Sequence, residues 1–261
     1  MTVYGLYARE VGGWISVSTL IRLLAELDVD AQAVRSSISR LKRREILVAE
    51  RRDGRAGYAL SPYARSVLET GDRRIFERHA VTDDGWVIAV FSVPESERRH
   101  RHQLRSRLAW LGFGTVSSGI WIAPAHALDD TRDHLLRHGL DQYVDLFRGD
   151  YVAFGDPAEQ VGRWWDLDAL QKLYDDFVAE FTSMAGRWAG PGKVSDRDAF
   201  IDYVQVLTAW RRLPYLDPGL PSTLLPATWS GATAADLFAT LRHALADPAH
   251  EFARSLLDDP S

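Results

Sequence analysis

"DAQAVRSSISRLKRREILVAERRDGRAGYAL", residues Asp30–Leu60, contains two different hydrophobic periods. In the first half, apolar residues recur at spacings of three and four, which predicts a helix from an Asp30 cap to about Glu45. The second half alternates on both sides of Asp53-Gly54, a dipeptide favoured in hairpin turns. A helix followed directly by a hairpin is the order of a winged helix-turn-helix, so we predict that fold here.

The predicted helix has one apolar side and one side without acidic residues. Val34, Ile38 and Leu41 form a narrow stripe on a helical wheel, which we expect to pack inward. No Asp or Glu occurs between Gln32 and Arg44, although solvated helices usually gain from oppositely charged neighbours. This pattern indicates an anionic partner, and the adjoining hairpin adds further arginines.

We therefore expect this segment to bind DNA. Helix residues facing the major groove would approach bases, and the flanking and hairpin arginines would hold phosphates. The expected base contacts are Gln32, Ser36, Ser39 and Arg43. The expected phosphate contacts are Arg35, Arg40, Arg51, Arg52 and Arg55. A winged helix that binds another protein is the alternative.

Composition supports a cytoplasmic protein with a polyanionic partner. The net charge of −5 divides unevenly, with +5 over residues 1–113 and −10 over residues 114–261. Such asymmetry would orient the basic part toward nucleic acid. The chain has no Cys, which excludes disulfides and cysteine nucleophiles. We find no run of about 18 apolar residues and no signal peptide, so we expect no contact with a membrane.

The chain divides into three predicted domains of an α+β protein. Residues 1–80 form the winged helix. Besides the helix that starts at Asp30, we predict one helix capped by Ser18 and one from Ser61 that has Pro62 in its first turn. Residues 81–155 follow the order βαββαβ, which predicts a ferredoxin-like sandwich with helices on one face of the sheet. Residues 156–261 are mostly helical and rich in Trp, with a Pro-rich loop at Leu213–Gly231.

Segments along nearly the whole chain resemble the PaaX family, repressors of bacterial phenylacetate catabolism. They include "GGWISVSTLIRLLAELDVDAQAVRSSISRLKRREIL", "WVIAVFSVPES", "GFGTVSSGIWIAP", "WDLDALQKLYDDFVAEF" and "AWRRLPYLDPGLPSTLLPATWSG". The resemblance implies a homodimer whose winged helices bind a palindromic operator. It also implies a C-terminal domain that senses an effector or dimerises, and type members of the family respond to phenylacetyl-CoA.

The expected effector site lies in the C-terminal segment that is most similar to the family. Aromatic rings beside arginines suit an aryl-acyl-CoA, because Arg recognises phosphate and carboxylate with two parallel hydrogen bonds. We assign the site to Trp210, Arg211, Arg212, Asp217 and Trp229. The alternative is that the rings are core residues and that Arg211 or Arg212 pairs with Asp217 to fix the Pro-rich loop.

Catalysis has weaker support in the sequence. The middle domain resembles Cas2 nucleases, which hold a metal with an Asp at the end of the first strand, but Ser92 and Val93 occupy that place here. Asp130, His134 and His138 recur every four residues on one predicted helix, yet a further ligand is not identifiable, and His138 suits a helix C-terminus. We expect a non-enzymatic, ligand-responsive repressor of an aromatic-acid catabolic operon, without metal or cofactor. A metal-dependent nuclease is the alternative.

Overall fold

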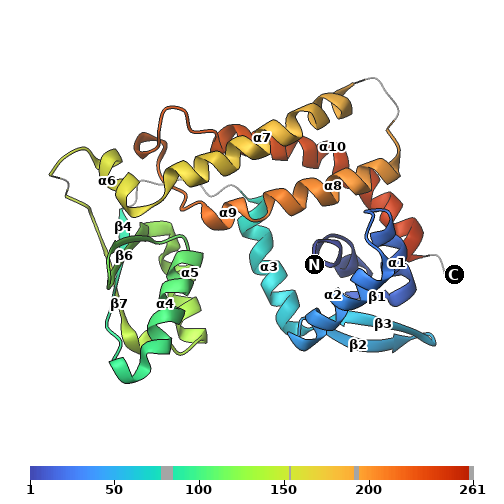
Figure 1. The fold of residues 1–261 in the computed structure, drawn as a ribbon, viewed down its shortest axis with the longest axis horizontal. Helices are drawn as coiled ribbons and strands as arrows, with labels where there is room; N and C mark the ends of the chain where they lie inside the picture. The colour runs from blue at the N-terminus through green and yellow to red at the C-terminus, as the bar shows by residue number, and fades with distance from the viewer. Residues whose placement is uncertain (78–84, 153, 191–193, 259–261) are drawn as a thin grey trace. The chain divides into compact units, whose positions relative to one another are not determined.

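The computed structural model describes residues 1–77, 85–152, 154–190 and 194–258. The fold is α+β, as predicted, with a three-stranded and a four-stranded sheet in the described residues. The chain divides into two compact units (Figure 1): unit 1 is Met1–Glu77, Phe177–Trp210 and Thr233–Ser261, and unit 2 is Arg78–Asp176 and Arg211–Ala232. The predicted boundary at residues 80 and 81 lies outside the described residues, and the division into three domains stays a prediction. No helix of the described part is both long and apolar enough to cross a membrane.

Unit 1 begins with the segment predicted to be a winged helix. Its elements in chain order are η1 (Tyr4–Ala8), η2 (Arg9–Val11), β1 (Trp14–Ser16), α1 (Val17–Ala25), α2 (Ala31–Arg43), β2 (Leu47–Arg52), β3 (Arg55–Leu60) and α3 (Pro62–Phe76). The strands pair antiparallel in the order β1-β3-β2. The β2–β3 hairpin is confirmed, and the order is compatible with a winged helix-turn-helix.

Side chains at the helix ends explain where these helices begin. Asp30 caps α2 as predicted, and Ser61 caps α3, with Pro62 in the first turn as predicted; each cap accepts a hydrogen bond from a backbone N–H of the first turn. The prediction for α1 is wrong by two residues: Ser16 is the cap, with Thr19 N donating to its Oγ at 3.0 Å, and Ser18 lies inside the first turn. Ser16 caps the helix because it has the extended backbone that a cap requires, with ψ of 154°.

Helices from the C-terminal part of the chain complete the core of unit 1. They are the second half of α7 (Leu167–Ala189), α8 (Asp196–Trp210) and α10 (Gly231–Leu257). Phe200 of α8 is fully buried, and its ring centroid lies 5.4 Å from those of both Tyr7 and Phe252. The N-terminal segment and the C-terminal helices therefore share one hydrophobic core.

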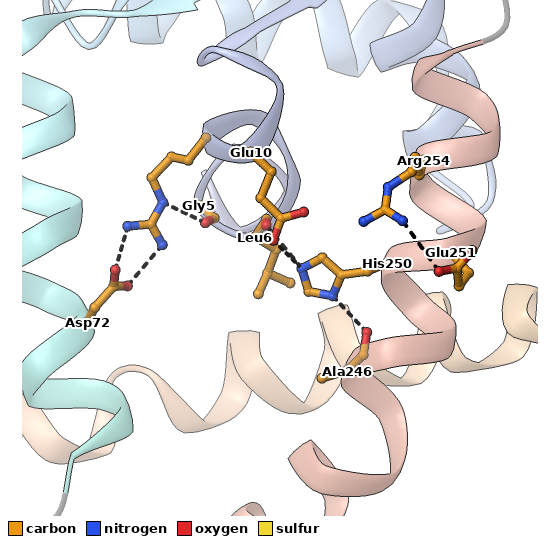
Figure 2. Close-up of polar contacts among 9 residues, drawn as sticks. Gly5, Leu6, Glu10, Asp72, Ala246, His250, Glu251 and Arg254 are labelled. Atoms are coloured by element: carbon orange, nitrogen blue, oxygen red, sulfur yellow. Dashed lines mark hydrogen bonds and ion pairs between the residues drawn. The ribbon is translucent and has the colours of Figure 1, made fainter.

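Polar contacts hold the N-terminal segment on two sides (Figure 2). Arg9 forms an ion pair with Asp72 of α3 and donates from Nε to the Gly5 carbonyl. On the other side, Nε2 of His250 lies 3.3 Å from both the Leu6 carbonyl and a Glu10 carboxylate oxygen. These contacts tie η1 and η2 to α3 and α10.

Unit 2 contains the predicted βαββαβ order. Its elements are β4 (Trp86–Phe91), η3 (Glu95–Glu97), α4 (Arg98–Trp110), β5 (Gly114–Ser117), β6 (Ile120–Pro124), η4 (Ala125–Ala127), α5 (Leu128–Arg137), η5 (Asp141–Tyr143), β7 (Val144–Gly149), α6 (Pro157–Trp164), the start of α7, α9 (Leu213–Leu216) and η6 (Ser222–Leu224). The antiparallel sheet has the order β5-β6-β4-β7, which confirms the ferredoxin-like prediction.

Both faces of this sheet carry a hydrophobic cluster. On one face α4 and α5 pack through Leu104, Leu108 and Leu135, with the two helices beside the strands in Figure 1. On the other face Ile122 of β6 packs with α6 and with the Pro-rich loop. The sequence predicted the first layer only, because the second layer comes from segments far along the chain.

Candidate nucleic-acid interface

Helix α2 presents its polar side to solvent because its apolar side is used in packing. Val34 and Ile38 are 1% and 5% exposed. The Asp30 carboxylate accepts from the backbone N–H groups of Gln32 and Ala33 at 2.8 and 2.9 Å, which fixes the start of the helix. The six predicted DNA-binding residues of the helix are all exposed: Gln32, Arg35, Ser36, Ser39, Arg40 and Arg43.

The charges on this side of α2 are not neutralised by carboxylates of the described residues. Arg40 donates to Ser37 Oγ at 3.1 Å and has no ion pair with any residue that the structure describes. Within the described residues, Arg35 and Arg43 have no hydrogen-bond or ion-pair partner. Exposed guanidinium groups without carboxylates nearby produce a positive potential that attracts phosphates.

The hairpin turn has the backbone that Asp53-Gly54 predicts. Asp53 and Gly54 have φ of 49° and 76°, the left-handed values that a two-residue turn of this kind requires. Arg51 is exposed and donates to the Gly54 carbonyl at 3.0 Å, and Arg55 is half-buried beside the turn. The hairpin thus carries basic side chains at its tip.

Arg52 differs from the other predicted phosphate contacts. Its Nε donates to Glu50 at 2.7 Å, and its guanidinium lies 5.5 Å from the ring centroid of Trp14. Strand alternation places residues 50 and 52 on the same side, so this pair could have been predicted from the sequence. Arg52 is held within the hairpin by these two contacts.

The predicted effector residues are divided between the two units. Trp210 belongs to the core of unit 1, where it is 6% exposed and stacks on Phe238 with centroids 4.7 Å apart. Its indole N–H donates to the Ile75 carbonyl at 3.0 Å. Arg211 and Arg212 are exposed and belong to unit 2.

Asp217 and Trp229 meet through Tyr174. The Tyr174 hydroxyl donates to Asp217 Oδ2 at 2.6 Å, and Gly219 N donates to Oδ1 at 2.8 Å. The Trp229 ring contacts Tyr174 edge-on at 5.6 Å, and burial raises the pKa of the tyrosine hydroxyl, which therefore stays a neutral donor. The alternative expectation of a pair between Asp217 and Arg211 or Arg212 is wrong: in the described residues the Asp217 carboxylate binds Tyr174 and Gly219 instead.

Helix α5 carries Asp130, His134 and His138, but these residues do not form a metal site. His134 is 7% exposed, its ring stacks on that of His138 at 4.3 Å, and its Nε2 faces Arg107 at 3.3 Å. His138 lies at the C-terminal cap of the helix, as predicted. Across the described ranges, no group of three or more His, Cys, Asp and Glu side chains is arranged to hold a metal ion.

His134 makes the stability of unit 2 depend on pH. Burial lowers its pKa to about 4, and the charges of His138 and Arg107 add to the shift. The unfolded chain takes up this proton near pH 6.5, so it binds more protons than the folded chain between those values, and stability falls as the pH falls. We expect the unfolding free energy to drop by about 1 to 2 kcal/mol more between pH 7 and pH 5 in the wild type than in His134→Gln.

Urea denaturation followed by circular dichroism at pH 7 and pH 5 measures this difference. His102→Gln is the matched control, because it removes an exposed histidine from α4 of the same unit. If the unfolding free energy had the same pH dependence in the wild type and in His134→Gln, that result would contradict a lowered pKa for His134.

The first strand of the middle unit ends two residues before the predicted end at Val93. β4 ends at Phe91, and Ser92 and Val93 follow it. The backbone N–H of Ser92 donates to the Tyr143 carbonyl at 3.2 Å, and Val93 is 6% exposed. Neither side chain is a carboxylate, in contrast to the Asp expected there from the resemblance to Cas2 nucleases.

The fold and the site place this protein among α+β proteins with two features. One is a basic helix and hairpin compatible with a winged helix-turn-helix, and the other is a ferredoxin-like unit. Three family models match in the same order, "PaaX-like protein" at residues 1–64, "PaaX protein central Cas2-like domain" at 79–161 and "PaaX-like protein C-terminal domain" at 165–255. The chain belongs to the PaaX family.

Two known proteins are similar to this chain over most of its length. The Transcriptional repressor PaaX of Escherichia coli (strain K12) is 25% identical over 256 residues, which cover 96% of this chain and 80% of the relative. The solved structure of an uncharacterized protein from Mycobacterium tuberculosis has a TM-score of 0.61 at 23% identity, covering 95% of this chain and 99% of that one. At that identity the structure supports the fold alone.

Proposed function

We propose that this protein is a transcriptional repressor that binds double-stranded operator DNA through α2 and the β2–β3 hairpin. One observation carries the proposal: the exposed side of α2 has polar and basic residues only, with guanidinium groups that have no carboxylate partner among the described residues. The similar protein from Escherichia coli is named a transcriptional repressor, which supports repression of transcription as the function.

The placement of each side chain suggests how the contacts divide. Gln32, Ser36, Ser39 and Arg43 would enter the major groove and contact bases, because they lie opposite the buried Val34 and Ile38. Basic residues on the flanks and at the hairpin tip would hold phosphates, and these are Arg35, Arg40, Arg51 and Arg55. Arg52, bound to Glu50 and stacked on Trp14, would mainly stiffen the hairpin.

We further propose a homodimer on a palindromic operator in an aromatic-acid catabolic operon. Two winged helices related by a twofold axis would contact half-sites about 34 Å apart, or a multiple of that spacing. The effector would be an aryl-acyl-CoA recognised by unit 2, with the Tyr174–Asp217–Trp229 cluster on the aryl group and Arg211 and Arg212 on the phosphates. The protein would act in the cytoplasm without catalysing a reaction.

Arg43→Ala tests the assignment of α2. We expect affinity for a duplex selected by the wild-type protein from random DNA to fall about tenfold or more, with relaxed preference at one base position. Arg51→Ala should instead weaken binding to all duplexes and reduce the slope of log K against log salt by about one unit. Fluorescence anisotropy over a range of salt concentrations measures both quantities.

Arg105→Ala is the matched control, because Arg105 is an equally exposed arginine on α4 of unit 2. Unchanged affinity and selectivity in Arg43→Ala would show that this side of α2 does not contact bases. A wild-type protein with no salt-dependent DNA binding would favour a winged helix that binds another protein.

A further inference from the structure

A cavity lies directly behind α2, on the side opposite the proposed DNA contacts. Its volume is about 210 Å³. Val34, Ile38 and Leu41 of α2 form one wall, Leu20 and Leu24 of α1 another, and further walls come from η1 and α8. All of these elements belong to unit 1. An apolar hollow with a few polar groups in its lining is a candidate for a ligand.

The side chains that line the cavity are mostly apolar, and none of them is charged. Among these described residues, Tyr4 has the one ionisable side chain, and burial raises the pKa of its hydroxyl, which already donates to the Tyr58 carbonyl at 3.1 Å. The remaining polar side chains are hydroxyls of Thr2, Ser37 and Thr208, and Thr2 Oγ1 lies 3.0 Å from Thr208 Oγ1. A carboxylate or phosphate would lose its hydration here without a side chain of opposite charge.

The volume limits the ligand to about one ring. An apolar cavity of about 150 Å³ holds benzene, so 210 Å³ has room for a ring with one or two small substituents. A peptide or an acyl-CoA is too large. Thr208 is exposed and lines the cavity, which places an entrance at α8.

We propose that this cavity binds a small, neutral, single-ring compound and that its occupation stabilises α2. The N-terminal wall is held by the Arg9–Asp72 pair and by His250 (Figure 2), so a ligand would gain contacts with α2 against a fixed support. The site is separate from the proposed acyl-CoA site in unit 2. Neither the binding of the ligand nor the stabilisation of α2 rests on the proposed function.

The probe is p-cresol, which is neutral at pH 7 because a phenol ionises near pH 10, and benzoate is the charged comparison. By isothermal titration calorimetry on the full-length protein we expect saturable p-cresol binding with a Kd on the order of 0.1 to 1 mM and no benzoate binding at equal concentration. At ten times Kd, hydrogen exchange of amides 31–43 should slow by up to about tenfold.

Two variants occupy the cavity with a protein side chain. Val204→Phe places a ring inside it, and Thr208→Phe places one at the entrance; each should reduce p-cresol affinity at least tenfold. Thr182→Phe is the matched control, since Thr182 is an exposed threonine on α7 away from the cavity and should leave binding unchanged. Thr208→Phe keeps the test decisive if Val204→Phe does not fold.

Three results would overturn the proposal: no saturable p-cresol binding, equal binding of benzoate, or unchanged affinity in both Val204→Phe and Thr208→Phe. Unchanged exchange of α2 amides at saturation would overturn the effect on α2. These readouts contain no DNA. If the wild-type protein failed to bind any duplex, the proposed function would fail, whereas p-cresol binding to the cavity would be unaffected.

Discussion

Reversal of two charges on α2, in an Arg35→Glu, Arg43→Glu variant, is expected to remove measurable DNA binding at physiological salt. Both side chains are exposed and lack partners among the described residues, so their replacement should leave the fold intact. Each arginine is expected to contribute about 1 to 3 kcal/mol to binding, and a glutamate in its place repels phosphates. The expected loss in affinity is therefore roughly 10²- to 10⁴-fold.

A matched variant separates this local effect from the change in net charge. Arg99→Glu, Arg105→Glu makes the same charge change on α4, where both arginines are exposed. We expect it to lose affinity about threefold or less by anisotropy at the same salt concentration. An equal loss in both variants would show that α4 shares the DNA contact, whereas an unaffected α2 variant would refute the proposed interface.

Phe200→Ala is expected to lower the unfolding free energy of unit 1 by about 3 to 5 kcal/mol. The Phe200 ring is fully buried between Tyr7 of η1 and Phe252 of α10, so its removal leaves a cavity where three distant segments meet. Because the N-terminal segment shares this core, we expect α2 and the C-terminal helices to lose stability together. Urea denaturation and amide hydrogen exchange measure the two effects.

Phe147→Ala is the control for this prediction, because Phe147 is 55% exposed on β7 and should cost less than about 1 kcal/mol. If Phe200→Ala destabilised the C-terminal helices while amide protection in residues 31–60 stayed at the wild-type level, the two segments would be independent domains. That result would favour the three-domain division predicted from the sequence over a shared core.

Local patterns were enough to predict the elements that carry the proposed interface. The cap at Asp30, the stripe of Val34 and Ile38 and the turn at Asp53-Gly54 each depend on neighbours within a few residues, and all three are confirmed. The βαββαβ order was predictable for the same reason, since each strand and helix shows its own hydrophobic period. Even the error at Ser18 is local, because two serines compete for one cap position.

The sequence by itself therefore determined the elements and the side of α2 that faces outward, since periodicity and capping are properties of short segments. Only the tertiary structure decided which distant segments share a core. It placed Trp210 on Phe238, joined Asp217 to Tyr174 and left a cavity between α2 and α8. Such contacts depend on how side chains from separate parts of the chain pack against one another. The hydrophobic period of a short segment does not predict that packing.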